Sequence, residues 1–223
     1  MHAAREGQKH VTQDDFMYAR DRIIMGVEQE FVLDEKDKKR VAIHESGHVL
    51  AALLLEHADP IEKVSIIPRG QALGMTEQLP LKDIKNFPKT YLLDKIGVML
   101  GGRAAEQTLL GDLSSGAAND LKEATSLATH MVSQWGMSEL LGPVYYQKGE
   151  DHVFLGREMA MPKDFSEATA KLIDDEVRKI ITEKEEEVLK LFTTHKKEII
   201  ALSDRLAEKE LLYADEIRNL VDL

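Results

Sequence analysis

The sequence predicts a mainly α-helical fold that carries one small β element. Of its 223 residues, 43% are hydrophobic and only 5% are aromatic, and Ala, Leu, Glu and Lys, which favour helix, are abundant. Apolar residues recur at helical spacing through most of the chain, whereas strand-like patterns are confined to one segment between Lys63 and Leu79. A charged fraction of 31% is ordinary for a globular protein of this length.

Two helices are predicted first. One runs from Val11 to Gly26, with Thr12 or Asp14 as its cap. The second runs from Asp34 to Leu55 and begins with a run of charged residues. The apolar stripe expected on the first helix consists of Phe16, Ala19, Ile23 and Ile24.

A β hairpin and a third helix follow. Lys63 to Ile67 is typical of a strand, the next residues have turn chemistry, and Leu73 to Leu79 is the expected returning strand. Pro88 suits the first turn of a helix that extends to about Leu110. The predicted fold class is therefore mainly α with a small β hairpin or sheet.

The C-terminal half is predicted to be helical apart from an irregular stretch, 136–161. One helix spans Asn119 to Trp135, with Leu121, Ala124, Ala128, Met131 and Trp135 as its stripe. Asp164 and Glu167 resemble a capping box that opens a long helix to about Phe192, whose buried face includes Leu172, Ile173, Val177 and Val188. A last helical hairpin is expected from His195 to the end.

Charge and composition exclude several classes of function. A formal net charge of −11 argues against a nucleic-acid partner, since a phosphate-binding surface needs the opposite sign. Without cysteine, His and carboxylates are the remaining zinc ligands. The longest apolar run, Val49 to Leu55, is far shorter than the roughly 20 residues of a membrane span. No signal peptide is expected after Met1.

The pattern His44-Glu-Ser-Gly-His48 carries the clearest chemical signal. Positions i and i+4 of a helix lie on one face, so the two imidazoles can reach one ion at about 2.0–2.1 Å. Glu45 would project beside the metal and act as general base toward a coordinated water. The apolar residues on both sides of the pattern indicate partly buried histidines, which need partners. The sequence predicts a zinc site here.

A third protein ligand is expected in a catalytic zinc site. The downstream candidates are His57, Glu106, Asp120, Glu123 and His130. His57 lies just past the helix end and is interpreted as a surface residue. Glu106 follows Gly101 and Gly102, which suggest close helix packing, while Asp120 opens a helix, where an acidic residue also favours the helix dipole. Residue chemistry alone leaves Glu106 and Asp120 equal.

Five ordered blocks then resemble a known family. They are His44-Glu-Ser-Gly-His, Ser65-Ile-Ile-Pro-Arg-Gly-Gln-Ala-Leu-Gly, Leu100-Gly-Gly-Arg-Ala-Ala-Glu, Ser115-Gly-Ala-Ala-Asn-Asp-Leu and Trp135-Gly-Met-Ser-Glu-Leu-Leu-Gly-Pro-Val. Together they are similar to the peptidase domain of the FtsH family, the membrane-anchored ATP-dependent zinc proteases. The likeness covers nearly the whole chain.

This resemblance implies a helical metallopeptidase domain with His44, His48 and Asp120 as zinc ligands and Glu45 as the catalytic residue. Glu106 then becomes a candidate for a carboxylate that orients a ligand or that serves helix packing, and its role stays open. Residues 1–27 would be a leader and the last helix of an ATPase module, and residues 28–223 the peptidase domain.

The resemblance also implies partners and a location. They are a homohexameric ring with enclosed active sites and unfolded or damaged protein substrates, membrane proteins included. The parent would be anchored in a bacterial inner membrane with the peptidase on the cytoplasmic face, or in an organelle membrane. ATP and the membrane would be engaged only through segments outside this chain, which has no Gly-x-x-x-x-Gly-Lys-Ser/Thr phosphate loop.

Departures from the family pattern are small. Ser46 stands where the family usually has Ala, and Ser114 or Ser115 where it has Thr.

Two rival functions remain. One is an adaptor domain that keeps the zinc fold, against which Glu45 argues, and the other is a hydrolase of small substrates. The hairpin segment Leu73 to Leu79 is the expected edge for an extended peptide, with a hairpin that only covers the core as the alternative.

Overall fold

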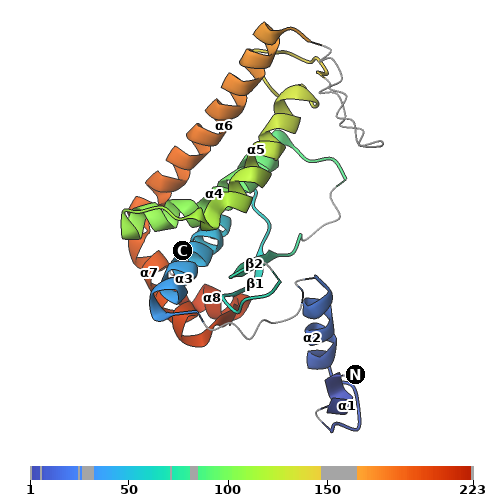
Figure 1. Ribbon diagram of the computed structural model, residues 1–223, viewed down its shortest axis with the longest axis vertical. Coiled ribbons are helices and arrows are strands. Elements are labelled where there is room, and N and C mark those ends of the chain that lie inside the picture. The colour runs from blue at the N-terminus through green and yellow to red at the C-terminus, as the bar shows by residue number, and fades with distance from the viewer. Residues whose placement is uncertain are drawn as a thin grey trace, which may run out of the picture.

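The computed structural model describes residues 2–5, 7–24, 26, 33–70, 72–80, 85–146 and 165–221. Helices dominate these residues, and three short strands form one sheet (Figure 1). In chain order the elements are α1 (His2–Arg5), α2 (Gln13–Ile24), α3 (Glu35–Leu54), β1 (Ile61–Ser65), β2 (Met75–Gln78), α4 (Lys89–Leu110), η1 (Ser115–Ala117), α5 (Ala118–Ser133), α6 (Glu167–Thr194), α7 (Lys196–Lys209), β3 (Leu211–Tyr213) and α8 (Ala214–Leu220).

Helices α3 and α4 cross at the centre of the molecule. Asp34 caps α3 by accepting a hydrogen bond from the backbone N–H of Asp37 at 2.8 Å. At the crossing, a Cβ added to Gly47 would lie 2.3 Å from the carbonyl oxygen of Gly101. Any side chain there would force the helices apart, so the two glycines set the distance between the backbones. The close packing expected from Gly101 is confirmed.

The sheet has the order β2-β1-β3 and is antiparallel throughout. Ser65 of the central strand is paired with Met75 on one side and with Leu211 on the other. The predicted hairpin is therefore present, with β2 as an edge strand. Strand β1 is largely buried, and its Lys63 is only 2% exposed, beside Glu77 of β2.

Two apolar cores surround the crossing. The first joins α3, the sheet and the C-terminal elements, with Leu50, Phe192 and Leu212 among its fully buried side chains. The second joins α4, α5 and the first half of α6, around Leu100 and Met131. Helix α6 runs past α4 and α5, and α7 returns against α3 (Figure 1). Both cores therefore hold α4 against its neighbours.

Several predictions need correction. The last segment is not a plain helical hairpin, because Leu211–Tyr213 pairs with β1 as a third strand. Ser166, whose side chain accepts from the N–H of Thr169, is the cap of α6, so the capping box expected from Asp164 is wrong. Asp164 itself lies outside the described residues.

Some predicted core positions are exposed instead. Trp135 follows the end of α5 and is 46% exposed, and Leu172 is also exposed on α6. Phe16 and Ile23 of α2 are exposed as well, because α1 and α2 project from the body (Figure 1). Within the described residues, no helix has the length and apolar character that crossing a bilayer requires.

Candidate metal centre

Helix α3 positions the three motif residues together. His44, Glu45 and His48 are 9%, 7% and 8% exposed, in a run of buried residues from Ala42 to Ala52. One helical turn separates the two histidines, and their ring centroids lie 4.8 Å apart. A Cβ added to Gly102 of α4 would lie 2.4 Å from Nε2 of His44, so only glycine leaves room for this ring. Burial and spacing are as the sequence predicts.

The inner ring nitrogens are fixed by acceptors on α4. Nδ1 of His44 donates to Oε1 of Glu106 at 2.8 Å, and Nδ1 of His48 donates to the carbonyl of Val98 at 2.8 Å. A carbonyl and a carboxylate only accept, so each ring has a proton on Nδ1 whether or not its Nε2 is also protonated. Both Nε2 atoms are then the nitrogens available to a metal ion.

Asp120, from the first turn of α5, closes the group. Its Oδ2 lies 3.2 Å from Nε2 of His44 and 3.6 Å from Nε2 of His48. Bonds of 2.0–2.1 Å in a tetrahedral site separate ligand atoms by about 3.3 Å. Each of the three residues offers one ligand atom, and these atoms all lie within 4.8 Å of one another. Two imidazoles and one carboxylate at these separations fit a zinc ion.

The charges of the group are strongly coupled. Burial by itself lowers the pKa of His44, but its hydrogen bonds to Asp120 and Glu106 outweigh burial and raise the pKa to about 10. Burial alone would raise the pKa of Asp120, yet hydrogen bonds from His44 and His48 hold that pKa far below its usual value. The centre therefore attracts positive charge, whether a proton or a metal ion.

Glu45 lies beside this group and is held by strand β2. The hydroxyl of Thr76 donates to Oε2 of Glu45 at 2.8 Å, which leaves Oε1 without that bond. Burial raises the pKa of Glu45 above its ordinary value, more than the two histidines and Thr76 lower it. A carboxylate with a raised pKa is suited to accept and return a proton near neutral pH.

The centre opens into a cleft with a volume of about 1030 Å³. One wall comes from α3 and α4, one from the loop before α5, and one from the edge strand β2 and the residues leading into it. Apolar residues beside the metal group include Val41, Val98, Met99 and Leu73. A polymer chain could lie along β2 with the metal group beneath it.

The other third-ligand candidates lie elsewhere. Glu106 contacts the Nδ1 side of His44, not the Nε2 atoms, so it is placed to orient a ligand. His57 contacts Asp94, His130 contacts the carbonyl of Ser126 in its own helix, and Glu123 is exposed on α5. Of these two carboxylates, Asp120 lies beside the Nε2 atoms and Glu106 does not, so position favours Asp120 as the third ligand.

Sequence reasoning missed three contributors to the site. Thr76 holds Glu45, Val98 orients His48 through its carbonyl, and Arg40 binds Glu106. Arg40 lies four residues before His44 on a helix, which is a usable signal. A backbone carbonyl has no sequence signature, and the role of Thr76 depends on how the hairpin packs on α3.

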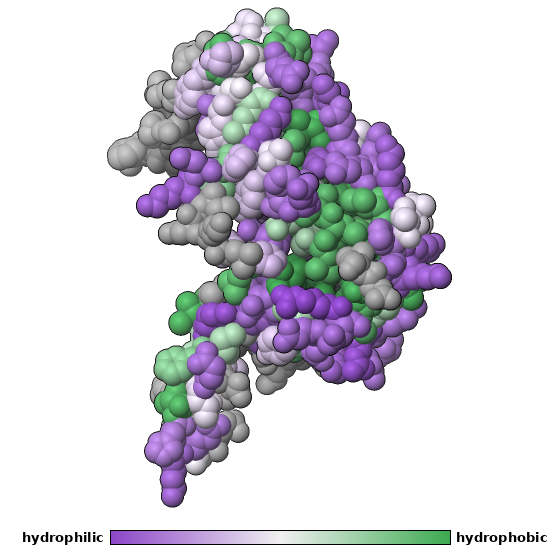
Figure 2. All heavy atoms as spheres, turned by 180° about the vertical axis from the view of Figure 1, so that it is seen from behind, coloured by the Kyte–Doolittle hydropathy of each residue, from purple (hydrophilic) through white to green (hydrophobic). Residues whose placement is uncertain are grey.

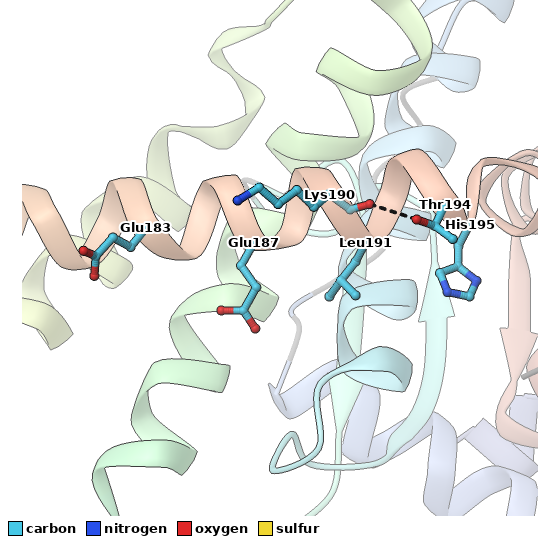
Figure 3. Close-up of a pocket in the computed structure, with 6 residues that line it drawn as sticks. All are labelled: Glu183, Glu187, Lys190, Leu191, Thr194 and His195. Carbon is cyan, nitrogen blue, oxygen red and sulfur yellow. Dashed lines mark hydrogen bonds between the residues drawn. The ribbon is translucent and has the colours of Figure 1, made fainter.

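A second hollow lies on α6 and differs in kind. It is lined by Glu183, Glu187, Lys190, Leu191, Thr194 and His195, all from one helix and its C-terminal cap (Figure 3). The carboxylates there are spread along the helix instead of converging on one point with the imidazole (Figure 3). This hollow has no arrangement that resembles the metal centre.

Two histidines one turn apart, a glutamate between them and a carboxylate from another helix define a metallohydrolase type of centre. The profile of peptidase family M41 matches residues 31–220. The chain is 50% identical over 216 residues to an ATP-dependent zinc metalloprotease FtsH of Nitrosococcus oceani, a match that covers 97% of this chain and 34% of the relative. It is 47% identical to the FtsH of Syntrophotalea carbinolica, covering 94% of this chain and 32% of that protein.

The chain belongs to peptidase family M41. It spans about a third of the length of the curated relatives that it matches. The resemblance inferred from the five sequence blocks is thus confirmed at the level of the family.

Proposed function

We propose that this chain is the zinc-dependent endopeptidase domain of a longer ATP-dependent protease. The observation that carries the proposal is the convergence of His44, His48 and Asp120 beside Glu45 in a cleft bordered by a strand edge. The family and the names of the relatives support the same reaction.

His44, His48 and Asp120 would hold the ion, and their separations fit one. Zinc, when bound, polarises the scissile carbonyl and lowers the pKa of a coordinated water to about 7. Glu45 takes the proton of the attacking water on Oε1 and delivers it to the leaving amine. Thr76 keeps Glu45 in place for both transfers, because its hydroxyl holds Oε2.

The peptide substrate would bind by adding a strand to β2. This strand is an edge of the sheet and lines the cleft beside Glu45, so an extended chain can use its free backbone groups. Only an unfolded segment of the substrate has its own backbone N–H and C=O groups available for this pairing. Met75→Pro should therefore cripple cleavage and leave zinc bound, because proline removes a backbone donor of β2. Unchanged cleavage by this variant would contradict the strand-addition mode.

The parent protein would thread substrates into the cleft with an ATPase module. The relatives are called ATP-dependent, and the chain matches only about a third of them. Residues 1–27, with the projecting α2, would be a leader and the last helix of that module, and residues 28–223 would be the peptidase domain. Substrates would be unfolded or damaged proteins, membrane proteins included, at the cytoplasmic face of a bacterial inner membrane; the two relatives described above are bacterial.

Assembly as a homohexamer is part of the same proposal. Figure 2 shows an apolar area at mid-height on the face turned away in Figure 1. Exposed apolar areas of this kind mark surfaces that contact other chains. Sedimentation of the parent protein would test the number of subunits.

Cleavage of unfolded casein in zinc buffer tests the central claim. The native chain is compared with Glu45→Gln and with Glu123→Gln, a matched change of an exposed glutamate on α5. We expect Glu45→Gln to hold one zinc and to lose 10²- to 10⁴-fold in turnover, as loss of a general base does. Glu123→Gln should cut like the native chain. Cleavage by Glu45→Gln at the native rate would overturn the assignment of the base.

A further inference from the structure

We propose that Arg40 is a positioning residue that sets the affinity of the centre for its metal ion. The inference rests on the proposed metal centre and deepens it. Among the described residues, the ion-pair partners of Arg40 are Glu106 and Asp112, not the three ligands. It acts through two carboxylates that lie behind them.

The guanidinium of Arg40 bridges these two carboxylates. One nitrogen lies 3.0 Å from Oε2 of Glu106 and the other 3.0 Å from Oδ2 of Asp112. Glu106 is only 1% exposed, whereas the Arg40 side chain is 25% exposed at the wall of the cleft. A fork of two donors is the geometry that suits arginine and that lysine cannot reproduce.

Through Glu106 the bridge reaches His44. Oε2 of Glu106 accepts from Arg40, and Oε1 accepts from Nδ1 of His44 at 2.8 Å and from the hydroxyl of Ser114 at 3.0 Å. With both oxygens engaged, the carboxylate cannot rotate, so the ring of His44 is held with Nε2 toward Asp120. Groups that orient a ligating histidine in this way tune metal affinity.

Through Asp112 the bridge reaches the third ligand. Asp112 lies in the connection between α4 and α5, and this connection leads to Asp120. Arg40 is itself on α3, one turn before His44. One side chain therefore ties together the three segments that supply or orient the metal-binding atoms.

The charge of Arg40 works against this role only weakly. A cation near a dication lowers its affinity, but Asp112 balances the charge of Arg40, and the guanidinium is partly in water, where screening is strong. The fixing of the buried Glu106 by Arg40 should therefore outweigh the repulsion between Arg40 and the metal ion. Losing Arg40 is therefore expected to weaken zinc binding, not to strengthen it.

The experiment measures the zinc dissociation constant of the full chain by competition with a chromophoric chelator. Arg40→Met and Arg40→Lys are compared with the native chain and with Arg103→Met. Arg103 is a matched control, since it is 28% exposed and forms an ion pair with Glu185 away from the metal group. The absorption spectrum of bound Co²⁺ reports the ligand geometry in each variant.

Removing an orienting partner of a ligand costs about 10- to 100-fold in affinity, and Arg40 acts one contact further out. We expect Arg40→Met to bind zinc about 3- to 10-fold more weakly and to show an altered Co²⁺ spectrum. Arg40→Lys should stay weaker than native, because it keeps the charge but loses the bridge. Arg103→Met should be unchanged.

The outcomes separate this inference from the proposed function. If the native chain holds no zinc, the metal centre and this inference both fail. If it binds zinc and Arg40→Met binds equally well, only the role of Arg40 is overturned, and full affinity in Arg40→Lys would reject the bridge. Lower stability of metal-free Arg40→Met with native zinc affinity would show a structural role alone. Should Arg40→Met not fold, Asp112→Asn, at a 70% exposed position, must weaken zinc binding by about 2-fold for the bridge to stand.

Discussion

Two buried polar clusters lie on helix α4 or contact it, and they differ in where their positive charge comes from. In the first, the carboxylate of Asp94 accepts from the ammonium of Lys184 at 3.0 Å and from the backbone N–H of His57 at 3.0 Å. Nδ1 of His57 lies 3.2 Å from the same carboxylate. Lys184 and Asp94 are each 8% exposed. The chain itself supplies the cation that this carboxylate needs.

The second cluster is the metal centre. Two Nε2 atoms and one oxygen of Asp120 converge there, and each ring has its Nδ1 proton engaged elsewhere. Burial lowers the pKa of His44, but its hydrogen bonds to Asp120 and Glu106 prevail and raise that pKa to about 10, so this group of acceptors favours positive charge. A buried carboxylate that is paired with a lysine of the same chain indicates a structural role. Imidazole and carboxylate atoms that converge on one point, with no lysine or arginine between them, indicate a binding site for a ligand.

The largest expected effect is the loss of the metal. A four-ligand zinc site is worth about 10–16 kcal/mol, so one ligand accounts for about 2.5–4 kcal/mol, or about 10²- to 10³-fold in affinity. His48→Ala should weaken zinc binding by this factor, measured by chelator competition. His57→Ala removes a histidine of the Asp94 cluster and serves as the control. Equal zinc affinity in the two variants would erase the distinction between the clusters.

Lys184→Met should break the Asp94 cluster and spare the metal centre. It leaves a buried carboxylate without its ammonium, which costs about 3–5 kcal/mol. The lower end is expected, since His57 still donates to Asp94. Urea unfolding measures the loss, and the zinc dissociation constant should not change. A stability within 1 kcal/mol of native, at about the level of exposed pairs, would mean that this pair behaves like a surface ion pair.

Ser46→Ala should stabilise the chain by about 1 kcal/mol. The hydroxyl of Ser46 is buried without a hydrogen-bond partner, unlike the satisfied groups of both clusters. Alanine removes this unsatisfied group and favours helix. The family resemblance places alanine at this position. Unfolding in urea gives the change, and a destabilised variant would show that the hydroxyl is satisfied in solution.

The smallest effect concerns pH. Burial raises the pKa of Asp94, but its contacts with His57 and Lys184 prevail and lower that pKa below its usual value of 3.8. A depressed pKa contributes stability above about pH 4, and this contribution is lost as the pH falls through the folded-state value. The free energy of unfolding of native protein should therefore fall more steeply below pH 4 than that of Asp94→Asn. If the free energies of unfolding of the two proteins ran parallel below pH 4, the lowered pKa of Asp94 would be contradicted.

Much of the fold and part of the site could be predicted from local patterns. Asp34, Pro88 and Gly111 lie at helix ends, and the spacing of His44 and His48 depends on one helical turn. Strand β3 could not be predicted, because Leu211–Tyr213 becomes a strand only by pairing with a segment far away in the chain. The exposure of Trp135 and Leu172 likewise depends on where neighbouring helices stop, not on periodicity.

By itself, the sequence determined the chemistry of α3: two imidazoles on one face with a glutamate between them, since i and i+4 are neighbours on any helix. Only the tertiary structure brought Asp120 to the Nε2 atoms, although it lies 76 positions from His44, and put Glu106 behind the ring. It also decided that Arg40 joins these segments and that Thr76 holds Glu45. The physical reason is that contacts between distant residues depend on how helices and strands pack, and the close crossing at Gly47 and Gly101 sets that packing here.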